Sequence, residues 1–227
     1  MDIHKPKAAH SWREFAVEIG TIICGILIAL MLEQVVEAVH RNVEVKETRE
    51  ALRAELMQDK QRFALTVEAN NCAERQIPAY VAWANGGPKP PSLRIFRPLI
   101  RVSTWETVKF GAVPLMPLKE RIEIAALYDQ LLNVVGNLAR EGATIEALAD
   151  FDGLSILSPD QQSALLKAAA ANQRSTRHAS GTATRLITAI NAYVGPEQST
   201  PALPPVIRTG VDWACGRVAS DPFDIKS

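Results

Sequence analysis

The hydrophobic residues of the first part of the chain are spaced to form a membrane-spanning helix. Residues 15–32 are 18 residues of which only Glu18 is charged, and their apolar side chains cover every direction around a helix. Such a helix is about 27 Å long, close to the roughly 30 Å hydrocarbon core of a bilayer. Basic residues and Trp12 at its start suit insertion. We therefore predict a transmembrane helix over residues 12–39.

A cleaved signal peptide and a buried core helix are the alternatives to this anchor. A basic start and a weak small-residue site at Val36 and Ala38 outline a signal peptide, but Glu33 and Glu37 precede that cut. A core helix that is apolar on all sides needs a large surrounding core, and the rest of the chain supplies no obvious one. An uncleaved anchor fits the segment best.

Beyond residue 39 the pattern becomes amphipathic, and a stalk helix over residues 40–85 is predicted to continue from the anchor. No glycine or proline interrupts residues 26–77, and Pro78 then ends or kinks the helix. The face with Glu50, Arg53 and Glu55 is expected to be exposed. The opposite, apolar stripe consists of Val45, Leu52, Leu56, Phe63 and Val67. This stripe needs a partner, either later helices of this chain, which we favour, or a second copy.

Residues 86–195 are predicted to form a helical extramembrane domain. Ser103 or Thr104 can cap a short helix, and a long helix starts beside Pro117 and closes near Gly142 before a further helical stretch. The inward face predicted for the long helix comprises Ile122, Ala125, Ala126, Leu132, Val135 and Leu138. The domain therefore offers the stalk at least one amphipathic partner.

A second long helix is predicted from Ser158 to about residue 194. Ser158 is a good N-cap, Pro159 occupies the first helical position and Gln161 can complete a capping box. Gly181 is a point where this helix can kink.

The predicted fold class is all-α. An N-terminal transmembrane helix continues into a long stalk helix, which packs with two further long helices in a small bundle. Residues 1–11 form a short cytoplasmic tail, in which Ser11 can cap the first helix. Residues 196–227 are expected to form an extended C-terminal tail across the helices, because they contain several prolines and little periodicity.

The net charge and the spacing of small residues indicate which kinds of partner the chain can bind. The chain has 25 basic and 25 acidic residues, so bulk electrostatics predicts no nucleic-acid partner. Within the anchor, Thr21, Gly25 and Ala29 are spaced four apart and share one helical face, which suits close helix association. The expected partners are the lipid bilayer and either a second copy, giving a homodimer, or another envelope protein.

Three cysteines indicate the compartment. Cys24 lies inside the hydrophobic segment, whereas Cys72 and Cys215 lie beyond it and can pair in an oxidising compartment. Unpaired buried thiols are the main alternative, and a metal site has no supporting motif. A disulfide favours an exported C-terminal domain with the N-terminus in the cytoplasm.

No catalytic, cofactor-binding or metal site is predicted, and we expect no enzyme. The string Asp150-Phe-Asp152-Gly resembles the start of haloacid-dehalogenase-type phosphatases, in which two aspartates hold magnesium. That motif needs an apolar strand before it, but the preceding residues here are helical. The string reads better as an inter-helix turn.

The start of the chain, residues 4–56, resembles a family of uncharacterised bacterial membrane proteins. Its members have a basic, proline-containing tail, then a W-R-E-F-x-x-E-I-G-T-I-type membrane helix followed directly by a charged helix. The resemblance implies a single-pass inner-membrane protein with a helical periplasmic domain and no assigned activity. An interaction, scaffold or accessory role in the envelope is the expectation, and a membrane-anchored signal-sensing module is the alternative.

Overall fold

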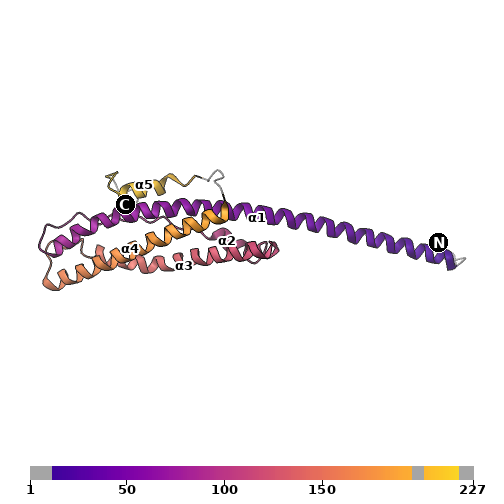
Figure 1. The fold of residues 1–227 in the computed structure, drawn as a ribbon, viewed down its shortest axis with the longest axis horizontal. Helices are drawn as coiled ribbons and strands as arrows, with labels where there is room; N and C mark the ends of the chain where they lie inside the picture. The colour runs from indigo at the N-terminus through magenta and orange to yellow at the C-terminus, as the bar shows by residue number, and fades with distance from the viewer. Residues whose placement is uncertain (1–11, 196–201, 220–227) are drawn as a thin grey trace, which may run out of the picture. The chain divides into compact units, whose positions relative to one another are not determined.

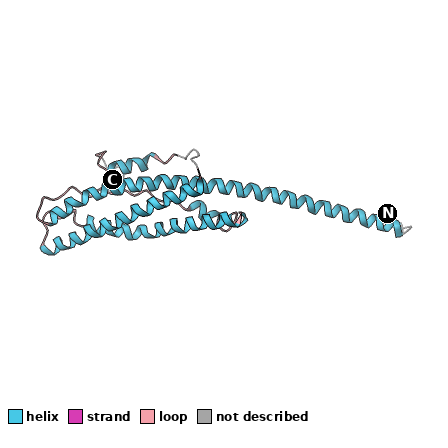
Figure 2. Cartoon of the chain, viewed as in Figure 1, coloured by secondary structure: helices cyan, strands magenta, loops and turns pink. Residues whose placement is uncertain are grey.

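The computed structural model describes residues 12–195 and 202–219 (Figure 1). Its helices are α1 (Trp12–Ala84), α2 (Ser103–Val108), the short 3₁₀ helix η1 (Val113–Leu115), α3 (Leu118–Ala149), α4 (Pro159–Val194) and α5 (Pro205–Ala214). The described residues contain no strand (Figure 2), which confirms the all-α prediction. The predicted cytoplasmic tail, with Ser11, lies outside the described residues.

The chain divides into two units, one before Thr48 and one from Thr48 onward. In the first unit no described residue is buried. This part of α1 contains an 18-residue window that is long and apolar enough to cross a membrane. The structure therefore supports a helix that could span a bilayer at the predicted place.

The second unit is a helical bundle built from α3, α4 and the part of α1 that follows Thr48. Helices α3 and α4 pack against each other. Hydrogen bonds join α1 to α3 through Arg49 and Glu120, and α1 to α4 through Asn70 and Ser180. The apolar stripe of α1 therefore packs on its own chain: Leu52, Leu56 and Phe63 are buried, as the favoured interpretation predicts.

The core at one end of this bundle is aromatic and aliphatic. It consists of Ile77, Tyr80, Trp83, Ala84, Leu148, Leu157, Leu165 and Ala169. These residues come from the last two turns of α1, the end of α3, the connection after it and the start of α4. Removing their apolar surface from water holds this end of the bundle together.

The start of α4 has the capping interactions that the sequence predicts. The Ser158 hydroxyl accepts a hydrogen bond from the Gln161 backbone N–H, and the Gln161 side chain accepts one from the Ser158 backbone N–H. Pro159 occupies the first helical turn. The predicted capping box is confirmed, and it satisfies backbone donors that have no partner inside the helix.

None of the three predicted interruption points ends its helix, and a kink at Pro78 or Gly181 stays a prediction. Pro78 lies exposed inside α1, Gly142 lies inside α3 and Gly181 lies inside α4, and each helix continues through them. Packing on both sides of such a residue can outweigh its local helix penalty. Consequently α1 ends at Ala84 and α3 at Ala149.

The inward face predicted for α3 is wrong at Ile122 and Ala126, which are exposed. Ile124 and Leu127 are buried instead, and the side chain of Leu138 lies outside the described ones. Apolar residues occur on more than one face of this helix, so a spacing of three or four residues fits several stripes. Packing against the other helices selects one of them.

The prediction of an extended C-terminal tail is wrong, because part of this tail forms α5. Pro205 occupies the first turn of this helix, where its missing N–H is not needed. Gly210, Val211 and Ala214 are buried and recur at helical spacing. Prolines that looked like chain breakers therefore start a helix, whose small and apolar face packs on the bundle.

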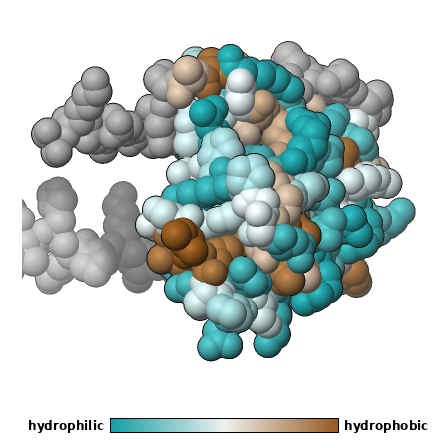
Figure 3. Space-filling view, turned by 90° about the vertical axis from the view of Figure 1, so that its left-hand side faces the viewer, coloured by the Kyte–Doolittle hydropathy of each residue, from teal (hydrophilic) through white to brown (hydrophobic). Residues whose placement is uncertain are grey.

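One end of the bundle is mainly hydrophilic. Figure 3 views the end where the connections after α1 and before α4 lie, and its surface is largely polar, with a small hydrophobic patch. In the connection between α3 and α4, Ile156 is 85% exposed.

Candidate functional site

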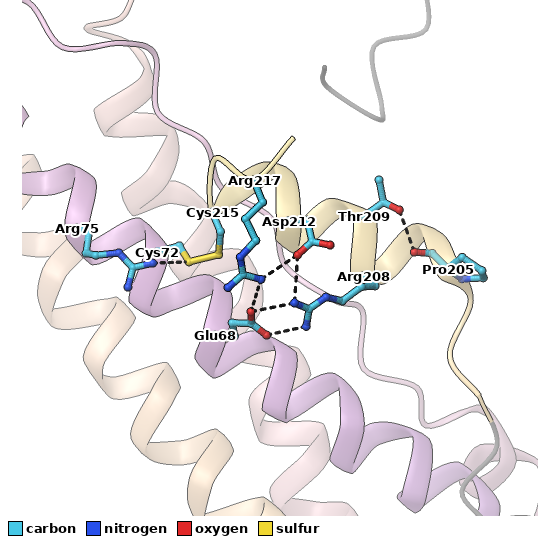
Figure 4. Close-up of polar contacts among 9 residues, drawn as sticks. All are labelled: Glu68, Cys72, Arg75, Pro205, Arg208, Thr209, Asp212, Cys215 and Arg217. Atoms are coloured by element: carbon cyan, nitrogen blue, oxygen red, sulfur yellow. Dashed lines mark hydrogen bonds and ion pairs between the residues drawn. A yellow bond between two sulfur atoms is a disulfide. The ribbon is translucent and has the colours of Figure 1, made fainter. Parts of the chain in front are cut away.

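The first candidate site is the place where α5 is fastened to α1 (Figure 4). Cys72 of α1 and Cys215, directly after α5, form a disulfide, so the predicted pairing is present. Cys72 is almost fully buried. The Arg75 guanidinium donates a hydrogen bond to the Cys72 sulfur, with 2.9 Å between Nη2 and Sγ. The bond closes a loop across most of the bundle, which restricts the unfolded chain.

A group of four charged residues lies beside the disulfide (Figure 4). Both Arg208 and Arg217 donate hydrogen bonds to the Glu68 carboxylate, at 2.9 Å and 2.6 Å, and Asp212 accepts one from Arg217 at 2.8 Å. Partial burial opposes ionisation of Glu68, but the two arginines outweigh it and lower its pKa. Because these groups are largely exposed, solvent screens the pairs and each contributes little to stability.

Close packing completes this attachment. A side-chain carbon added at Gly210 would come within 2.5 Å of the Phe96 ring. Val211 is fully buried. Glycine is therefore favoured where α5 crosses Phe96, because a larger residue would have to displace the ring. The disulfide, the charged group and this contact make the attachment a structural clasp.

The second candidate site is a buried carboxylate that joins α1, α2 and α3. Glu55 accepts hydrogen bonds from the Tyr128 hydroxyl at 2.9 Å, from the Thr104 N–H at 2.8 Å and from the Ser103 hydroxyl at 3.2 Å. The Trp105 ring stacks on Tyr128 with 4.7 Å between centroids. Burial, and then the charge of Glu55, raise the pKa of Tyr128. One carboxylate therefore fixes the first turn of α2.

This site corrects the prediction that Glu55 lies on an exposed face, because its side chain is buried. It also corrects the predicted capping of α2, since neither Ser103 nor Thr104 caps that helix with its side chain. A usable signal was present in the sequence. Glu55 lies next to the apolar stripe residues Leu52 and Leu56 at helical spacing, and a charge there needs buried partners.

One turn further along α1, Asp59 and Arg62 form a fully buried ion pair. Arg62 Nη1 lies 2.7 Å from Asp59 Oδ1, which also accepts a hydrogen bond from the Arg101 N–H at 3.1 Å. The other Asp59 oxygen is buried and has no hydrogen-bond partner. Burial raises the pKa of Asp59 to about 6, against the effects of the Arg101 N–H and Arg62. The pair ties the connection before α2 to α1.

A small cavity lies between α1, the connection before α2, α3 and α4. Arg97, Glu141 and His178 line it, and Arg97 Nη1 lies 2.7 Å from Glu141 Oε2. Burial lowers the pKa of Arg97 and raises that of Glu141. The cavity measures about 40 Å³. That volume suits water molecules, whereas sites for metabolites measure roughly 300–1,000 Å³.

The two phosphatase-like aspartates lie at the end of α3 and in the turn that follows it. Asp152 accepts hydrogen bonds from the Tyr80 hydroxyl at 2.6 Å and from the Leu93 N–H at 3.2 Å, while Asp150 ends α3. Asp152 therefore holds an inter-helix turn, as the favoured interpretation of this string predicts. Among the described residues, no group of three or more His, Cys, Asp and Glu side chains is placed to hold a metal ion.

The small-residue face of the anchor is accessible in this structure. Thr21, Gly25 and Ala29 are exposed, and no heavy atom lies within 4 Å of a side-chain carbon built at Gly25. The Thr21 hydroxyl donates to the Val17 carbonyl oxygen at 2.9 Å, within the same helix. Association through this face stays a prediction.

Comparison with known proteins finds no matching family model, curated protein or solved structure.

Proposed function

We propose that the chain is a single-pass protein of the bacterial inner membrane and acts as an interaction, scaffold or accessory protein of the envelope. Its N-terminus is cytoplasmic and its helical unit is periplasmic. The observation that carries this proposal is a pair of features in one chain: an unburied apolar helix before Thr48 and a disulfide after it. The first suits lipid and the second suits an oxidising compartment.

The resemblance of residues 4–56 to bacterial membrane proteins with the same type of start supports the inner-membrane location. The balanced charge favours protein and lipid partners over nucleic acid. The side-chain clusters of the helical unit hold its own elements together, as Glu55 and Asp152 do. A bundle stabilised in this way offers a surface for another envelope protein. A second copy of the chain would instead associate through the anchor face of Thr21, Gly25 and Ala29.

The test is a thiol-accessibility experiment on intact cells whose outer membrane has been made permeable. Cys24 is replaced by alanine, so that Cys72 and Cys215 are the remaining thiols, and a bulky membrane-impermeant maleimide reports each free thiol as a shift in gel mobility. We expect a full-length protein in the membrane fraction that is not labelled until it is reduced. In the Cys72→Ser variant, the half-buried Cys215 should be labelled without reductant, whereas the buried Cys72 of the Cys215→Ser variant should be labelled without reductant once the protein is unfolded.

Three other outcomes would contradict the proposal in different ways. A soluble product shortened by about the length of the predicted anchor would show a cleaved signal peptide. A membrane-bound Cys72→Ser protein whose Cys215 reacts only after cell lysis would place the helical unit in the cytoplasm. A full-length soluble protein with free thiols would refute the anchor and the disulfide together.

A further inference from the structure

A cluster of exposed apolar side chains surrounds the start of α3. Phe110 is 86% exposed, Leu118 62% and Ile122 60%, and Leu115 is also exposed. Residues 110–118 contain no charged residue, and Lys109 and Lys119 flank them. Soluble surfaces normally scatter such residues singly. We refer to Phe110, Leu115, Leu118 and Ile122 as the apolar tip.

The apolar tip lies at the end of the helical unit where α1 enters it. Glu120, two residues after Leu118, accepts hydrogen bonds from Arg49 at 2.6 Å and 2.8 Å. Arg49 directly follows Thr48, the first residue of the unit. The predicted anchor ends at residue 39, so at most about 30 Å of chain separates it from Thr48. The unit is therefore tethered to the proposed membrane by the end that carries the tip.

The charges around the tip suit a phospholipid surface. The Lys119 side chain is 89% exposed and lies 3.9 Å from Glu123, and Lys109 lies 2.5 Å from Glu106 and 5.1 Å from the centre of the Phe110 ring. The Arg121 guanidinium donates to the Pro114 carbonyl oxygen at 3.1 Å. The exposed Lys119 beside Leu118 can reach phosphate groups while the apolar groups enter the bilayer interface, whereas Lys109 is 26% exposed and is paired with Glu106.

We propose that the apolar tip docks on the surface of a bilayer that contains acidic phospholipids. This inference rests on the proposed membrane anchor. A second protein copy fits the tip less well, because four partly exposed side chains can bury on the order of 500 Å², below the roughly 800 Å² per partner of a stable interface. Tethering lowers the affinity that the tip needs, since docking becomes intramolecular.

The experiment compares three positions in the full-length protein, reconstituted in vesicles of phosphatidylcholine and phosphatidylglycerol. Each protein carries one polarity-sensitive fluorophore, and lipids with nitroxide-labelled chains quench fluorophores that enter the bilayer. The first label is placed on Cys24, the free cysteine of the natural chain. The second and third are placed in Leu118→Cys and Ile156→Cys proteins that also carry Cys24→Ala. Ile156, in the connection after the far end of α3, is the apolar control and is 85% exposed against 62% for Leu118.

We expect strong quenching at Cys24, and quenching at position 118 several-fold stronger than at position 156. Lys119→Glu should lower the ratio of docked to free tip at least about fivefold, because each basic residue near an acidic surface contributes about that factor. Lys167→Glu, on an exposed position of α4, is the matched charge control and should have little effect.

The outcomes separate the two proposals. Quenching at Cys24 with equally weak quenching at positions 118 and 156 would refute docking of the tip and leave the anchor intact. Absence of quenching at Cys24 would refute the anchor and, with it, this inference. Strong quenching at position 118 that is unchanged by Lys119→Glu and by omission of phosphatidylglycerol would refute the role of acidic lipid.

Discussion

The two parts of α1 have the same backbone structure and opposite surfaces. Before Thr48 no described residue is buried, and large apolar side chains such as Ile22 and Ile26 are more than half exposed. After Thr48 the helix buries charged groups, including Glu55 and Arg62, among apolar ones. An α-helix satisfies its backbone hydrogen bonds in either environment. The side chains therefore decide whether such a helix needs lipid or protein around it.

The largest expected effect comes from breaking the apolar surface of the first part. Replacing both Ile22 and Ile26 by arginine should oppose membrane insertion by about 5–7 kcal/mol, since one arginine at the centre of a membrane helix costs about 2.5–3.5 kcal/mol. Most of the protein should then leave the membrane fraction. Extraction of membranes with alkaline carbonate measures the fraction that stays inserted.

Ile156→Arg is the matched control, because Ile156 is exposed on the helical unit. This single variant should remain in membranes like the natural protein. Retention of the Ile22→Arg/Ile26→Arg protein at the natural level would mean that residues 15–32 are not in lipid.

The second prediction breaks the buried charge of the other part. Glu55→Ala leaves the Tyr128 hydroxyl, the Thr104 N–H and the Ser103 hydroxyl without their acceptor. Because these donors cannot all reach water, the free energy of unfolding should fall by about 3–5 kcal/mol. Urea unfolding of the oxidised protein in detergent, followed by circular dichroism, measures the change.

Two variants sharpen this result. Glu47→Ala removes a carboxylate that is exposed on the same helix and should change stability by less than about 0.5 kcal/mol. Glu55→Gln keeps one acceptor oxygen, so its free energy of unfolding should lie between those of Glu47→Ala and Glu55→Ala. Equal stabilities of the Glu47→Ala and Glu55→Ala proteins would show that Glu55 does not hold α2.

The helices of this fold could be predicted more reliably than their faces. Hydrophobic spacing and the Ser158 cap are local signals, so the long helices and the start of α4 were predictable. The disulfide was predicted from the oxidising compartment that we expect and from the two cysteines that lie beyond the anchor. The buried face of α3 was not predictable at Ile122, because several stripes satisfy the same spacing and the choice depends on distant helices.

The candidate sites were harder to predict for a related reason. The partners of Glu55 lie 48–73 residues away in sequence, and no local pattern distinguishes its carboxylate from an exposed one. Likewise, α5 is a short helix that is held by Cys72, Glu68 and Phe96, all of them remote. Isolated helices of this length are marginal in water, so its own sequence carries a weak signal.

The third prediction concerns the pH dependence that the buried Asp59 gives to the helical unit. Its pKa of about 6 in the folded protein exceeds the ordinary 3.8. The folded protein therefore holds a proton that the unfolded chain releases between these pH values. This stabilisation is complete below pH 3.8 and is lost as pH rises through about 6. The difference between the two pKa values corresponds to roughly 3 kcal/mol in the free energy of unfolding.

Urea unfolding at neutral pH and near the lower end of that range measures this contribution as a difference between the natural protein and Asp59→Asn. Asparagine does not titrate, so the variant should lack the gain in stability on acidification that Asp59 supplies, although loss of the partner of Arg62 lowers its stability at both pH values. Parallel pH profiles of the two proteins would contradict a titrating Asp59.

The smallest expected effect concerns the clasp between α5 and α1. Gly210→Ala places a methyl group within 2.5 Å of the Phe96 ring, and the resulting displacement of α5 should cost about 1–3 kcal/mol. Because Cys215 directly follows α5 and its disulfide partner Cys72 is buried, dithiothreitol should also reduce Cys72–Cys215 faster when α5 is displaced in this variant. The rate of reduction, followed by alkylation and gel mobility, is the measurement.

Gly153→Ala provides the matched glycine control, because no heavy atom lies within 4 Å of the carbon that it adds and its backbone φ is not positive. It should leave both stability and the rate of reduction unchanged. If the Gly210→Ala and Gly153→Ala proteins behaved alike, the contact between Phe96 and α5 would not limit access to the disulfide. The charged group around Glu68 would then remain as the element that holds α5 over Cys72.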